Sequence, residues 1–155
     1  MKAPRVYVDT SVFGGCFDEE FSAPSRRFFD QVRTGRLILL VSEVVLRELA
    51  EAPPRVRTPL ASLPARSVRP ASLGPEAIRL RDAYVARGIV PRRFENDATH
   101  VAAATLSGAD AIVSWNFHHI VRIEKIRAYN QVNLELGFSL LSIVSPQDIR
   151  FDEDE

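Results

Sequence analysis

Short runs of apolar residues alternate along this chain with longer segments in which apolar residues recur at every third or fourth position. Continuous apolar runs of this length are typical of strands buried on both faces of a parallel sheet. We predict strands at residues 5–8, 36–42, 110–114 and 138–146. The segments between them are long enough to hold the helices that must connect parallel strands.

The helical segments have recognisable ends. The helical segment within 22–35 has a Ser or Pro start and stops at Gly35. Ser42 is placed to cap a second helix, which continues through Glu51 until two prolines end it. Further helices are predicted within 75–88, 95–108 and 117–137, the second of them starting at Asn96 or Asp97 and the last being partly irregular. The buried stripe of the 75–88 helix is expected to consist of Ala77, Ile78, Leu80 and Tyr84.

Residues 53–75 are the least regular part of the chain because six prolines interrupt them. One short helix and a short edge strand near Ser67 and Val68 are expected there. The overall alternation of strand and helix predicts a mostly parallel sheet covered on both faces, since right-handed crossovers connect its strands. The expected fold class is therefore α/β, a three-layer α/β/α sandwich.

Composition gives wide limits. With 155 residues, 46% of them hydrophobic, the chain can bury a sizeable core, and we predict one domain over residues 1–149 followed by an acidic tail at 150–155. No apolar stretch approaches the roughly 20 residues that cross a bilayer, and no export signal is evident. The single Cys16 cannot form an intramolecular disulfide. These features predict a cytoplasmic protein with no membrane partner.

The formal net charge of zero is unevenly distributed. Residues 1–149 carry 19 basic and 16 acidic side chains, because four of the 20 acids lie in the tail. Eighteen of the 20 basic residues are Arg, and eight of these lie in clusters at residues 26–27, 55–57, 66–69 and 92–93. Such groups can contact phosphates, but they are equally typical of solvated helix faces. Charge alone therefore does not identify nucleic acid as a ligand.

Polar side chains follow two of the predicted strands and lie in two of the helices. Asp9 and the pair Ser114 and Asn116 come at strand ends, where ligands of open α/β sheets gather. Glu48 and Asp97 lie in segments with helical spacing and would reach the same crevice from near helix ends. Three carboxylates and one amide are the oxygen donors that Mg²⁺ and Mn²⁺ prefer. The sequence thus indicates a hard-metal site.

Each of these residues has an alternative interpretation. Asp9 could cap the turn after its strand, and Asp97 could complement a helix dipole. Glu48 could pair with a neighbouring Arg on a wet helix face, leaving Glu43 or Glu51 as the ligand. His100 shares a helix face with Asp97, so it could be a half-buried structural residue or could contact the site.

In this order and at these spacings the motifs resemble the PIN domain family, in particular its VapC-like toxin ribonuclease branch. The motifs are Asp9-Thr-Ser, the helix from Ser42 to Glu48, Asp97 ahead of an Ala-rich helix, and Ser114-x-Asn116. The resemblance covers residues 5–146. It implies a Mg²⁺- or Mn²⁺-dependent endoribonuclease in the toxin role of a type II toxin–antitoxin pair, with an antitoxin protein as partner, RNA as substrate and a tendency to form homodimers.

The resemblance also implies roles for individual residues. Asp9, Glu48 and Asp97 match the family's acids and would hold the metal, and Asn116 stands where many members place a fourth acid, which lowers the negative charge of the site. Together these four would form the catalytic set. Ser11, Ser114 and His100 would orient the ligands or contact substrate.

Other interpretations remain open. Trp115 and Phe117 could stack on a base or bury their loop against the core, and His118 and His119 could touch RNA. A haloacid-dehalogenase-like phosphohydrolase also places an Asp after its first strand, but that family expects a second Asp where this chain has Ser11. A non-catalytic PIN-like module that binds RNA or protein is the remaining alternative.

Overall fold

The computed structural model describes residues 2–149 and shows a parallel sheet of five strands. The strands lie in the order β3-β2-β1-β4-β5, and every neighbouring pair is parallel. Their bounds are Arg5–Val8 (β1), Ile38–Ser42 (β2), Val68–Ala71 (β3), Ala111–Val113 (β4) and Ser142–Val144 (β5). The predicted α/β fold class is therefore confirmed.

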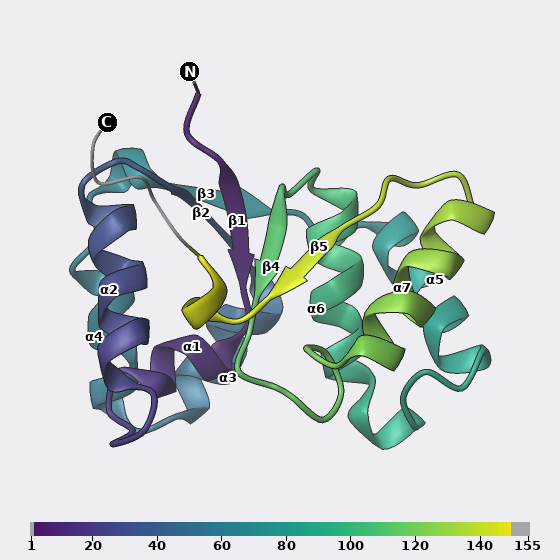
Figure 1. Ribbon diagram of the computed structural model, residues 1–155, viewed down its shortest axis with the longest axis horizontal. Coiled ribbons are helices and arrows are strands. Elements are labelled where there is room, and N and C mark those ends of the chain that lie inside the picture. The colour runs from purple at the N-terminus through teal and green to yellow at the C-terminus, as the bar shows by residue number, and fades with distance from the viewer. Residues whose placement is uncertain (1, 150–155) are drawn as a thin grey trace.

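Helices cover both faces of this sheet (Figure 1). Helices α1 and α2 lie on one side and α5, α6 and α7 on the other, while α3 packs against both α1 and α6. The α-helices are Thr10–Gly15 (α1), Ser22–Arg33 (α2), Glu43–Glu51 (α3), Thr58–Ala61 (α4), Pro75–Ala86 (α5), Glu95–Leu106 (α6) and Ile123–Glu135 (α7). Short 3₁₀ turns occupy Pro54–Arg57 (η1), Ala65–Ser67 (η2), Arg92–Phe94 (η3) and Pro146–Asp148 (η4).

Most of the predicted boundaries hold, for the expected local reasons. Ser42 caps α3 by accepting a hydrogen bond from the Val45 amide, and Gly35 and Gly88 follow α2 and α5 with positive φ, which glycine adopts without strain. The proline-rich segment contains α4 and the edge strand β3, as predicted. The predicted start of α6 is wrong, because the helix already begins at Glu95, so Asp97 lies inside its first turn.

Two asparagines, the half-buried Asn130 and the fully buried Asn133, connect the last helix to the rest of the fold. Asn130 exchanges hydrogen bonds with the backbone of Leu141 just before β5. Asn133 accepts a hydrogen bond from the Tyr84 hydroxyl at 2.5 Å and donates to Thr105, so it joins α7 to α5 and α6. Neither asparagine was assigned a role on the basis of the sequence. Both are structural.

The strand order creates a crevice at the carboxyl ends of β1 and β4. The chain leaves β1 for a neighbour on one side and leaves β4 for a neighbour on the other, so the two connections diverge at this point. Val8 pairs with Val113, and the next residues, Asp9 and Ser114, therefore emerge side by side. Ligands of open α/β sheets bind at such switch points.

Trp115 packs the segment after β4 against α1 and α2. Its ring is buried, stacks on Phe21 with centroids 4.1 Å apart, and donates Nε1–H to the Ser25 hydroxyl at 2.8 Å. Gly15 leaves the space for this ring. Trp115 thus buries its loop, the more ordinary of its two predicted uses, and fixes the position of the neighbouring Asn116.

Within residues 2–149, no helix has both the length and the apolar character needed to cross a membrane. Cys16 is buried and its thiol is free, and burial raises its pKa to about 11. A thiol with so high a pKa is unreactive at neutral pH. The predicted acidic tail at 150–155 lies outside the described residues.

We expect Gly15→Ala to destabilise the protein while Gly14→Ala does not. A Cβ at position 15 would lie 2.5 Å from Ser25 Oγ and 2.7 Å from Trp115 Nε1, whereas one at position 14 meets nothing within 4 Å. Overpacking of this kind costs about 1–3 kcal/mol, while Gly→Ala at an open helical position is neutral or stabilising. Thermal unfolding measures both variants. Equal stability of the two would contradict the close packing of Trp115.

Candidate active site

Asp9 is the most deeply buried of the three predicted acids. Its side chain is only 4% exposed and follows directly on β1. Ser11 Oγ donates to Oδ1 at 2.5 Å, and Ser114 Oγ donates to Oδ2 at 2.7 Å. Both serines were predicted to orient ligands from the side, and the structure places a hydroxyl of each on a different oxygen of this carboxylate.

The same two hydroxyls also hold the segment that carries Asn116. Ser11 Oγ accepts a hydrogen bond from the Trp115 amide, and Ser114 Oγ accepts one from the Asn116 amide, each at 2.9 Å. Asp9 is therefore connected to the backbone of the β4–α7 connection through one hydroxyl on each side. A change at Asp9 would be felt at Asn116.

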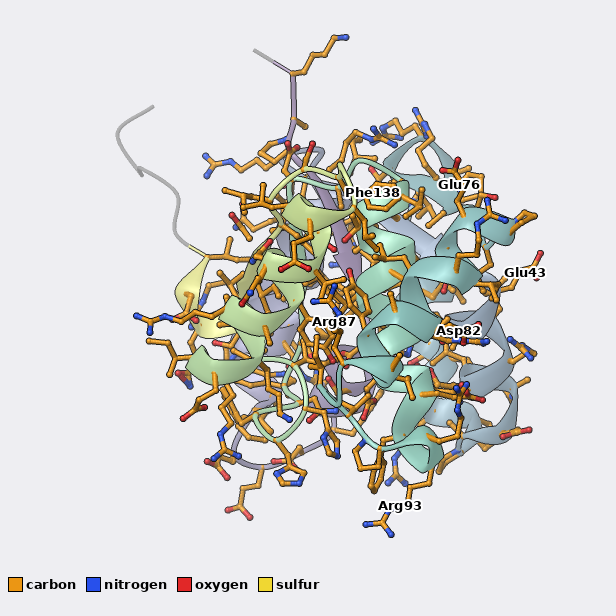
Figure 2. The ribbon with its side chains drawn as sticks, turned by 90° about the vertical axis from the view of Figure 1, so that its right-hand side faces the viewer. Glu43, Glu76, Asp82, Arg87, Arg93 and Phe138 are labelled. Carbon is orange, nitrogen blue, oxygen red and sulfur yellow. The ribbon has the colours of Figure 1, made fainter. Side chains whose placement is uncertain are left out.

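Glu48 faces the site from the exposed side of α3. Its Oε1 accepts hydrogen bonds from Thr10 Oγ1 at 2.8 Å and lies 2.7 Å from His100 Nε2. Glu43 and Glu51, the alternatives on the same helix, are exposed, and Figure 2 shows Glu43 pointing away from the molecule. Of the three acids on α3, Glu48 is the one directed at the site.

A buried chain of hydrogen bonds stands behind Glu48. His100 is 2% exposed, and its Nδ1 lies 2.7 Å from the Tyr7 hydroxyl, which is itself 2.7 Å from Ser42 Oγ. His100 thus has both ring nitrogens bonded, and it is fully buried rather than half-buried as predicted. If Ser42 donates to Tyr7 and Tyr7 to Nδ1, then Nε2 carries the proton that is directed at Glu48.

Asp97 and Asn116 form the outer part of the site and are both partly exposed. Asn116 Oδ1 accepts hydrogen bonds from the amides of His118 and His119, at 3.1 and 2.8 Å, so its carbonyl oxygen is committed to the backbone turn. Its amide group is left to interact with Asp97, and this interaction opposes the rise in the pKa of the Asp97 carboxyl that burial causes.

Burial and mutual repulsion set the charges of the three acids. Burial raises the pKa of Asp9, and the Asp97 charge raises it further, against the opposing effects of His100 and the two serine hydroxyls. Burial also raises the pKa of Asp97, with a smaller contribution from Glu48. At Glu48 burial acts in the same direction, but the bonds from His100 and Thr10 prevail and lower its pKa. Glu48 is therefore the most readily ionised of the three.

The donor chemistry fits a hard cation, while the packing is looser than that of a closed metal cage. The three predicted metal ligands, Asp9, Glu48 and Asp97, all offer carboxylate oxygen, and a divalent cation would relieve the repulsion that Asp9 and Asp97 exert on each other. Over residues 2–149, however, no three His, Cys, Asp or Glu side chains are grouped closely enough to hold a metal ion. The acids lie around one crevice without converging on one point.

Sequence reasoning missed Tyr7, Thr10 and Ser42. Tyr7 sits in a buried strand, where aromatic residues are ordinary, and Ser42 was recognised only as a helix cap. The one available signal was the polar hydroxyl of Tyr7 within an otherwise apolar run, because buried hydroxyls need partners.

Comparison with known proteins supports the fold. No protein-family model matches the sequence, and no curated protein matches it significantly. Among solved structures, the chain is similar to a chain of VapBC2 from Rickettsia felis, which was crystallised bound to a DNA fragment from its promoter. The TM-score is 0.58 with 12% identity, over 91% of this chain and 98% of that one. The fold is therefore PIN-like, as the sequence motifs predicted.

Replacing Asp9 with Asn should stabilise the metal-free protein at neutral pH. The pKa of the Asp9 carboxyl is raised in the folded protein, so ionising this group lowers the stability of the fold. This loss of stability is absent below the pKa that the carboxyl has in the unfolded chain, and it develops as pH rises through the folded pKa. In EDTA at pH 7 we expect Asp9→Asn to melt a few degrees above wild type, at about 2–4 °C per kcal/mol. The difference should shrink toward about pH 4. A gain independent of pH, measured by thermal melting, would contradict the raised pKa.

Proposed function

We propose that the protein is a divalent-metal-dependent endoribonuclease that hydrolyses RNA phosphodiester bonds. The observation that carries this proposal is the position of Asp9 and Asn116 beyond the carboxyl ends of β1 and β4, at the switch point of a PIN-like sheet. Asp97 lies close enough to interact with Asp9, Glu48 and Asn116. Two of the acids have raised pKa values and repel each other. A site of this kind is suited to bind a cation and the phosphate that the cation attracts.

In this proposal each side chain has a separate task. Asp9 and Asp97 would hold Mg²⁺ or Mn²⁺, which when bound would supply Lewis acidity and lower the pKa of a water. Glu48, ionised and fixed by Thr10 and His100, accepts a proton from the attacking water. Asn116 donates its amide to a phosphate oxygen, since its carbonyl oxygen is already bonded to the backbone.

We further propose an antitoxin protein as partner, because the similar structure from Rickettsia felis is a VapBC2 complex. An antitoxin would block the crevice, and an Arg inserted among the carboxylates would form charge-assisted hydrogen bonds there. A cytoplasmic location and a homodimer complete the proposal. A dimer would join two crevices and widen the surface available to RNA.

One observation favours a second candidate, a PIN-like module that binds RNA or protein without cutting. The acids of residues 2–149 form no ready group of three around one point, and the Asn116 oxygen is engaged by the backbone. Metal dependence separates the two candidates, because a binding module does not need an ion to act.

The test is cleavage of a pool of structured and single-stranded RNA by wild type, Asp9→Asn and Asp110→Asn, each in Mn²⁺, Mg²⁺ or EDTA. Asp110 is a matched control, because it lies before β4 at the opposite end of the sheet and accepts a hydrogen bond from the Arg5 amide. We expect wild type and Asp110→Asn to cut in metal only, and Asp9→Asn to lose at least about a hundredfold in rate.

All three proteins must first be shown to be folded by circular dichroism. Cutting that persists in EDTA, or that Asp9→Asn retains in full, would contradict the metal mechanism. Absence of cutting in every condition, together with undetectable Mn²⁺ binding, would favour the binding module.

A paired Tyr→Phe comparison tests the chain behind Glu48. Tyr7→Phe removes the hydroxyl that bonds His100 and Ser42, and Tyr84→Phe removes an equally buried hydroxyl that bonds Asn133 far from the site. Each should cost about 1–3 kcal/mol of stability, measured by urea unfolding. We expect only Tyr7→Phe to lower kcat, by about tenfold, with KM little changed. Equal kcat in both variants would show that the chain is structural alone.

A further inference from the structure

Two phenylalanines beside the candidate site are exposed to solvent. Phe94 ends the turn η3 just before α6 and is 38% exposed, and Phe117 follows Asn116 and is 47% exposed. Isolated exposed apolar residues are common, so exposure alone assigns no role to either ring.

Each exposed ring is supported from behind by buried aromatic side chains. Phe94 packs on the buried His119, with centroids 4.5 Å apart. Phe117 lies 6.0 Å from the ring of Trp115 and 6.4 Å from that of Phe21. Rings held in this way present a fixed face, whereas a free side chain would lose rotamer freedom on binding a ligand.

The two rings belong to the two segments that carry the outer part of the site. Phe94 lies three residues before Asp97, and Phe117 directly follows Asn116, which is hydrogen-bonded to Asp97. Asn116 Oδ1 accepts hydrogen bonds from the amides of His118 and His119, and these bonds fix the turn that carries Phe117. A phosphate that accepts a hydrogen bond from the Asn116 amide would therefore have an aromatic ring available on each segment.

Basic groups accompany Phe94. The Arg93 guanidinium lies 5.1 Å from the Phe94 ring centroid, and Figure 2 shows the Arg93 side chain projecting from the lower end of the molecule. This is the end toward which β1 runs in Figure 1. His118, two residues after Asn116, is exposed in the same region. The combination of aromatic faces with cationic groups matches single-stranded nucleic acid, in which bases and phosphates alternate.

We propose that Phe94 and Phe117 are stacking sites for two unpaired nucleobases, one on each side of a phosphate bound by the Asn116 amide, and that Arg93 contacts the neighbouring backbone. This inference rests on the proposed function, because it takes RNA as the ligand of this end of the sheet. Stacking uses the π-face that every base has, so the two sites would favour unpaired over duplex RNA without selecting a sequence.

The experiment measures binding in EDTA, so that cleavage is not needed. Fluorescence anisotropy gives Kd for a short labelled single-stranded RNA and for a strand of the same length whose sugars carry no bases. The variants are Phe94→Ala, Phe117→Ala and the corresponding Tyr variants, with Leu134→Ala as a control at an exposed apolar residue of α7. Arg93→Gln reports the backbone contact, and circular dichroism establishes folding.

We expect each Phe→Ala change to raise Kd for the RNA by about five- to a hundredfold and to leave Kd for the baseless strand unchanged. The Tyr variants and Leu134→Ala should bind as wild type does. Arg93→Gln should weaken both ligands alike and reduce the salt dependence of binding.

Three results would overturn the stacking sites. They are wild-type binding that does not distinguish the RNA from the baseless strand, Phe→Ala variants that bind RNA normally, and Phe→Ala variants that lose both ligands equally. Normal RNA binding by both Phe→Ala variants would assign the exposed rings to a protein partner instead. Wild-type binding that depends on both rings, without cutting in Mn²⁺, would uphold this inference while the nuclease proposal failed.

Discussion

The removal of the Asp9 carboxylate from water is the constraint on which the rest of the site depends. A buried ionised carboxylate is unfavourable unless hydrogen bonds or a cation compensate it. Hydroxyls on both sides of the sheet's switch point supply the hydrogen bonds, and each of these hydroxyls also accepts an amide of the segment after β4. The geometry around Asn116 therefore depends on the Asp9 carboxylate.

A second layer of support comes from α6, which carries both Asp97 and His100. Because these residues are three positions apart on one helix, they face the same crevice, one at its rim and one in its floor. His100 connects this helix to Glu48 on α3 and to Tyr7 in β1. The His100 imidazole thereby links three separate elements of the fold.

Much of this arrangement could be predicted from the sequence. Continuous apolar runs identified the buried strands. Ser42, Gly35 and the pair of prolines after Glu51 identified helix ends, since each acts through local backbone chemistry. The strand order could not be predicted, because periodicity does not encode which strands are neighbours. The bonds of Tyr7 and Thr10 were missed for the same reason, since their partners lie 93 and 38 residues away along the chain. Which acids bind a metal stays a prediction.

The position of β1 at the centre of the sheet has a consequence for synthesis of the chain. β1 is made first, yet its partner β4 ends only at Val113, and Ser114 and Asn116 follow still later. During translation the N-terminal half therefore emerges with an uncovered strand edge and an Asp9 that lacks one of its two hydroxyl donors. The crevice can be completed only after Asn116 has left the ribosome, so a product that ends before β4 would lack it.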